Sequence, residues 1–75
     1  MLTLEEDLSI RIDGMITEVM KRKKMSKADL GITLGMGKEA LTRLSTNNEL
    51  WKLSGDQIAM IAEAAGRDVE FPRRR

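Results

Sequence analysis

Two short helical segments separated by a glycine, in the middle of the chain, most constrain what it can fold into. Residues 27–34 and about 38–46 carry apolar side chains at helical spacing, and Gly35 lies between them. Ser26 followed by Asp29 is a capping-box pattern, so the first helix is expected to begin at Lys27. Gly35 is expected to end it, because the residue just past a helix often adopts the left-handed conformation that glycine tolerates. The pattern predicts two short helices packed across a tight turn.

Gly31 lies inside the first of these helices. An isolated glycine costs a helix roughly 1 kcal/mol relative to alanine, so its presence indicates that a second helix passes close by. The second segment has one buried stripe, formed by Ala40, Leu41 and Leu44. Its opposite face is polar and carries Lys38, Glu39, Thr42 and Arg43.

The stretch from Lys27 to Thr46 resembles the helix-turn-helix of the lambda-repressor and Cro class, also called the Xre-like family. The matching positions are the small residue, the turn glycine and five apolar residues, namely Gly31, Gly35, Leu30, Leu34, Met36, Leu41 and Leu44. Lys27 stands where the family usually has Gln. The resemblance implies an all-α fold, a compact domain of four to five helices, and sequence-specific binding in the major groove of double-stranded DNA.

By this resemblance, the groove-facing positions are Gly37, Lys38, Glu39, Thr42 and Arg43. Arg43 is the strongest candidate for reading a base, because arginine most often contacts guanine O6 and N7. Alternatively, it is an exposed cation that pairs with Glu39, four residues earlier. Glu39 either accepts from cytosine N4 or complements the positive end of its helix. Thr42 suits a thymine methyl group or a phosphate.

Lys27, Asn47 and Asn48 flank this face and are candidates for phosphate contacts, which position a protein without reading sequence. Two successive asparagines are equally typical of a turn. The DNA-binding residues predicted from the sequence are therefore Lys27, Gly37, Lys38, Glu39, Thr42, Arg43, Asn47 and Asn48.

Charge is segregated along the chain, although the formal net charge is only +1. Residues 1–20 contain one arginine and five carboxylates, a net charge of −4, whereas residues 21–45 contain seven cations and two carboxylates, a net charge of +5. The run Lys21–Lys24 is either a solvated helix end or a phosphate-contacting patch. A basic region on and beside the motif is the electrostatic footprint that phosphate binding requires.

The N-terminal residues allow two interpretations. Thr3 and Glu6 form a capping-box pattern that would open a helix, and residues 13–24 are predicted to be helical. Residues 8–12, however, alternate apolar and polar side chains and would also suit a short strand.

After the motif, Ser54 and Gln57 form a third capping-box pattern, opening a helix that Gly66 is expected to stop. Its apolar face is formed by Ile58, Ile61, Ala62 and Ala65. Trp51 is expected to be a core anchor rather than a stacking platform, because large aromatic side chains usually contribute buried area.

Residues 1–75 are expected to form a single domain with the motif at about 27–46 and a basic tail at 72–75. Val69–Phe71 alternates with acidic residues and suits a short terminal strand. In some members of the family that this chain resembles, a C-terminal strand pairs with its copy, so a homodimer is expected. The Arg73–Arg75 tail is either disordered or an arm that touches DNA.

The chain contains no His and no Cys, so the commonest general base and any thiolate metal site are absent. No catalytic constellation can be assembled, and we expect no enzymatic activity, metal, cofactor or small-molecule substrate. No apolar run approaches the ~20 residues of a membrane span, and the acidic start is unlike a signal peptide. A cytoplasmic location without membrane association is expected.

Two functions fit the sequence. The first is a small transcriptional regulator, a repressor of the phage or mobile-element type that acts as a dimer on a palindromic operator. The second is the antitoxin, or another protein-interaction module, of a toxin–antitoxin pair, in which the acidic N-terminal segment would dock a basic toxin.

Overall fold

Helices account for all the regular structure in residues 3–66, the part of the chain that the computed structural model describes. The elements are α1 (Leu4–Lys23), α2 (Lys27–Thr33), α3 (Ala40–Thr46), the 3-10 turn η1 (Leu50–Lys52) and α4 (Gly55–Ala64). The all-α prediction is confirmed for these residues. The predicted strand Val69–Phe71 and the tail 72–75 lie outside the described residues.

Three of these helices begin at capping boxes that are visible in the sequence, and each box is complete. Thr3 opens α1, Ser26 opens α2 and Ser54 opens α4. In α1, the Thr3 hydroxyl accepts from the Glu6 amide at 3.0 Å while the Glu6 carboxylate accepts from the Thr3 amide at 3.0 Å. Helix α3 differs, because Glu39 at its N-cap makes no side-chain hydrogen bond to the helix.

The N-terminal residues form the first turns of α1, so the strand interpretation of residues 8–12 is wrong. The buried side chains of this helix are Ser9, Ile12, Ile16 and Val19, which recur every three or four residues. Leu8 and Ile10, whose alternation suggested a strand, are 41% and 49% exposed. Helical spacing of the buried residues, supported by the capping box, decides the conformation here.

Helices α2 and α3 end in the same way. Gly35 is left-handed, with φ +79°, and the next amide, that of Met36, donates to the Gly31 carbonyl at 2.9 Å. After α3, Asn48 takes the left-handed role with φ +59°, and the Glu49 amide donates to the Leu44 carbonyl at 2.8 Å. Each of these bonds satisfies a carbonyl that the last helical turn leaves open. The predicted helix stop at Gly35 is confirmed.

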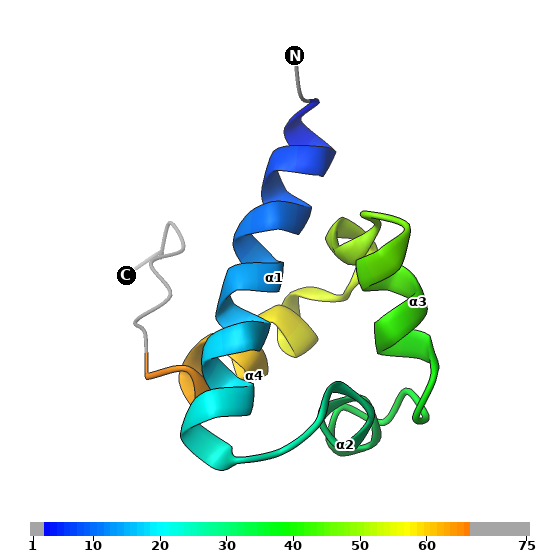
Figure 1. Cartoon of the computed structure of the whole chain (residues 1–75). Coiled ribbons are helices and arrows are strands. Elements are labelled where there is room, and N and C mark those ends of the chain that lie inside the picture. The colour runs from blue at the N-terminus through cyan, green and yellow to red at the C-terminus, as the bar shows by residue number, and fades with distance from the viewer. Residues whose placement is uncertain (1–2, 67–75) are drawn as a thin grey trace.

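The core lies between α1 and the elements that pack against it, namely α4, η1 and α2, while α2 also packs on α3 (Figure 1). Its fully buried members include Ile12, Ile16, Val19, Leu41, Leu50 and Ile61. The predicted inner face of α4 is observed, with Ile61, Ala62 and Ala65 buried and Ile58 half-buried.

Trp51 is not the core anchor that the sequence predicted. In η1 its neighbour Leu50 points inward and is 1% exposed, whereas Trp51 is 37% exposed. A single 3-10 turn places consecutive side chains on different sides, so only one of the two can enter the core. The Trp51 ring instead meets a cation, with the Lys52 ammonium 5.5 Å from its centroid.

Candidate nucleic-acid interface

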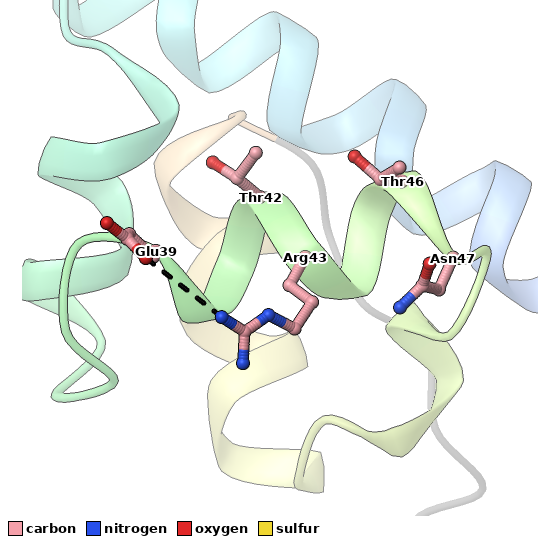
Figure 2. Close-up of a pocket in the computed structure, with 5 residues that line it drawn as sticks. All are labelled: Glu39, Thr42, Arg43, Thr46 and Asn47. Atoms are coloured by element: carbon pink, nitrogen blue, oxygen red, sulfur yellow. Dashed lines mark ion pairs between the residues drawn. The ribbon is translucent and has the colours of Figure 1, made fainter.

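The outer face of α3 carries a cluster of polar side chains (Figure 2). Leu41 points into the core and is 0% exposed, while Thr42, Arg43 and Thr46 are exposed. With Glu39 before the helix and Asn47 after it, these three line a shallow hollow of about 360 Å³. The structure therefore brings together four of the residues predicted from the sequence, Glu39, Thr42, Arg43 and Asn47.

Thr46 belongs to this surface but was missing from the predicted set. It lies four residues after Thr42, and Figure 2 shows the two threonine side chains on the same side of α3. The helical repeat from Thr42 was the signal that would have found it.

Glu39 and Arg43 form an ion pair along this face, with 4.0 Å between the Arg43 guanidinium nitrogen and the Glu39 carboxylate oxygen. Their side chains are 80% and 73% exposed, respectively. An exposed pair of this kind contributes little to stability. The ion pair leaves the guanidinium of Arg43 accessible to solvent and places the Glu39 carboxylate beside that guanidinium.

Three of the predicted residues precede α3 rather than beginning it, which corrects the sequence-based boundary. Gly37 has φ +90°, a conformation incompatible with a right-handed helix. Lys38 and Glu39 then form a turn, and the helix begins at Ala40. Both Lys38 and Glu39 are exposed, so they border the outer face of α3 from the turn.

Lys27 lies on the other flank of this face, joined to α3. Its ammonium donates to the Ser45 hydroxyl at 3.1 Å and lies 3.9 Å from the Asp13 carboxylate. The Ser45 hydroxyl in turn donates to Asp13 at 2.8 Å. Asp13 and Ser45 were not predicted, because no sequence pattern links positions 13, 27 and 45.

The two asparagines after α3 have different surroundings. Asn47 is exposed, whereas the Asn48 carbonyl accepts from the hydroxyl of Ser9 in α1 at 3.0 Å. Ser9 is 0% exposed, and its oxygen also accepts from the Trp51 amide at 3.1 Å. Asn48 therefore has the turn geometry that is typical of its residue type, and Ser9 fixes the loop that leaves α3.

The side chains of the basic run Lys21–Lys24 do not share one surface, because two of them lie near α4. All four side chains are exposed at the C-terminal end of α1, where cations favour the negative end of the helix dipole. The guanidinium of Arg22 lies against Gly66 after α4, with its central carbon 2.9 Å from where a β carbon on Gly66 would be. Lys23 lines a second hollow, about 330 Å³ in volume, with residues of α2 and α4. Arg22 and Lys23 are therefore associated with α4 as well as with α1.

Residues 3–66 contain no group of three or more acidic side chains placed to hold a metal ion. Within the same range, none of the helices combines the length and hydropathy needed to cross a bilayer. Comparisons with protein-family models, characterised proteins and solved structures give no significant match to this chain.

Proposed function

We propose that this chain binds double-stranded DNA in a sequence-specific manner, with α2 and α3 acting as a helix-turn-helix of the lambda-repressor and Cro type. Helix α3 would enter the major groove with Thr42, Arg43 and Thr46 facing the base edges. The single observation that carries the proposal is the exposed polar face of α3, opposite the buried side chain of Leu41 and positioned by the turn at Gly35.

The charge distribution supports this orientation. Lys38 borders one end of the face and Lys27 flanks it, so cations lie where the phosphates beside an inserted helix would be. Residues 21–45 carry a net charge of +5, whereas residues 1–20 carry −4. The domain would thus approach DNA with its α2–α3 side and turn the acidic first turn of α1 away.

In the cell, the simplest role is that of a small repressor of the phage or mobile-element type, which occupies an operator and excludes polymerase. We propose that two copies bind a palindromic operator, since a single reading helix contacts only a few base pairs. A repressor of this type would act in the cytoplasm.

Selection of bound duplexes from a random pool tests the proposal. The expected result is an enriched palindrome with half-sites about one helical turn apart. Thr42→Glu, which adds a negative charge to the outer face of α3, should abolish the enrichment. Ile10→Glu makes the same charge change at a 49% exposed position of α1 and should leave it intact. An unenriched pool, or equal loss with both variants, would refute the proposal.

A protein-interaction role, such as that of an antitoxin, is the second candidate. It is favoured by the N-terminal half of α1, where Leu4, Leu8 and Ile10 are 87%, 41% and 49% exposed beside an acidic first turn. A basic partner with an apolar contact would fit this surface. Neutralising Lys38 and Arg43 should remove DNA binding and spare the binding of such a partner, which separates the two functions.

A further inference from the structure

Three helices meet at a small polar cluster formed by Asp13 of α1, Lys27 of α2 and Ser45 of α3. The serine hydroxyl has one proton, which it donates to the Asp13 carboxylate at 2.8 Å. Its oxygen then accepts from the Lys27 ammonium at 3.1 Å. The chain of donors and acceptors therefore runs in one direction, from Lys27 through Ser45 to Asp13.

This cluster leaves the ammonium of Lys27 partly uncommitted. An ammonium has three N–H donors, and Ser45 accepts one of them. The Asp13 oxygen is 3.9 Å away, which is ion-pair distance but too long for a hydrogen bond. The Lys27 side chain is 28% exposed, so it is largely covered by protein and still reaches solvent.

The Lys27 head group lies beside the outer face of α3, the surface that we propose reads the bases. Ser45 lies three residues after Thr42 and is therefore its neighbour on the surface of α3. An ammonium anchored on Ser45 stands at the edge of that face, where a helix in the major groove meets a phosphate strand.

We propose that Asp13 is a positioning residue for DNA binding: acting through Ser45, it holds the ammonium of Lys27 in place as a ready-made ligand for one backbone phosphate. The inference depends on the DNA-binding function proposed above. A lysine side chain loses considerable rotamer freedom when it is fixed, and here that loss occurs on folding rather than on binding. Asp13 thereby contributes to affinity without touching DNA.

The hydrogen bonds of this cluster determine which substitutions test the proposal. Asp13→Asn keeps an oxygen that can accept from Ser45, whereas Asp13→Ala removes it. Lys27→Met removes the phosphate ligand and keeps an apolar stem. Arg11→Met serves as the control, because Arg11 pairs with Asp7 at 3.0 Å on the N-terminal half of α1.

The experiment measures binding of a short fluorescent duplex of arbitrary sequence over a range of salt concentrations, with thermal unfolding run on every variant. Lys27→Met should lower the salt slope by about 0.9, the value for one phosphate, while Arg11→Met leaves it unchanged. Asp13→Ala should bind roughly two- to tenfold more weakly than Asp13→Asn, which has the same charge and keeps the acceptor for Ser45, as expected for freeing one side chain.

The decisive comparison is between Asp13→Ala and Asp13→Asn in the Lys27→Met background. If Asp13 acts through Lys27, Asp13→Ala and Asp13→Asn bind alike there, whereas a general structural role would make Asp13→Ala the weaker of the two by the same factor in both backgrounds. The same factor in both backgrounds, or an unchanged salt slope in Lys27→Met, overturns the inference while DNA binding itself stands. Failure of the unaltered chain to bind any duplex would overturn both this inference and the proposed function.

Discussion

Gly31 of α2 lies directly against the carbonyl of Gly37, so closely that a β carbon on Gly31 would stand 2.7 Å from that oxygen. The same β carbon would lie 3.3 Å from the Leu41 side chain of α3. The absence of a side chain at Gly31 thus sets how near the turn and α3 approach α2.

Gly31→Ala should therefore destabilise the domain. Overpacking against backbone costs about 1–3 kcal/mol, which outweighs the roughly 1 kcal/mol gained in helix propensity. Gly14→Ala is the matched control, because a β carbon at Gly14 in α1 would meet nothing within 4 Å. That variant should be more stable by about 0.5–1 kcal/mol. Denaturant unfolding of both proteins measures the difference, and shifts of the same sign would contradict this account of Gly31.

Leu50 and Trp51 offer a second matched pair. Leu50→Ala should cost about 2–5 kcal/mol, because it leaves a cavity in the core. Trp51→Ala should cost about 1 kcal/mol or less, since the ring is 37% exposed and its cation contact is weak at such a site. Thermal unfolding tests the order. A larger loss with Trp51→Ala would mean that the aromatic ring is the anchor after all.

Ser9→Ala should destabilise the loop after α3. The substitution leaves the Asn48 carbonyl and the Trp51 amide without their partner in a partly buried place, at a cost of about 1 kcal/mol or more. Thr17→Ala removes another hydroxyl of α1, one that donates to the Asp13 carbonyl on the exposed side, and should change the stability little. Amide exchange at Trp51 should accelerate in Ser9→Ala only. Equal effects of the two substitutions would argue against Ser9 as the anchor.

Arg43→Ala should reduce affinity for the selected operator by about 1–3 kcal/mol and relax the preference at one base pair. Arg11→Ala breaks a comparable exposed pair four residues apart, that with Asp7, and should leave the base preference as it was. Repeating the random-pool selection with each variant checks this. An unchanged base preference in Arg43→Ala would show that Arg43 does not read a base.

Much of the fold was predictable because its signals are local. The capping boxes at Thr3, Ser26 and Ser54 involve residues three apart, and the stop at Gly35 depends on a single backbone conformation. The sequence was ambiguous only where two periodicities overlapped, at residues 8–12. There the burial of Ile12 and Ile16, which depends on α4 and η1, decided in favour of a helix.

The less predictable features depend on which elements meet. Neither the exposure of Trp51 nor the burial of Leu50 follows from residue type, since the larger side chain was the better candidate for the core. The Asp13–Ser45–Lys27 cluster joins three helices and has no local pattern. On the candidate interface, the polar face of α3 was predictable from helical spacing, whereas its first residue was not, because Gly37 and Glu39 lengthen the turn.

The missing side-chain cap at Glu39 sets α3 apart from the other three α-helices described between residues 3 and 66, each of which has a capping box. Its first amides have no side-chain acceptor, and its seven residues depend on packing against α2 and η1. Helices held in this way open locally at a lower free energy than the global transition. We therefore expect native-state hydrogen exchange to be fastest in α3 among the four helices, and a DNA duplex to slow exchange there more than anywhere else. Helix α3, which we propose reads the bases, would then become fully ordered only on binding DNA.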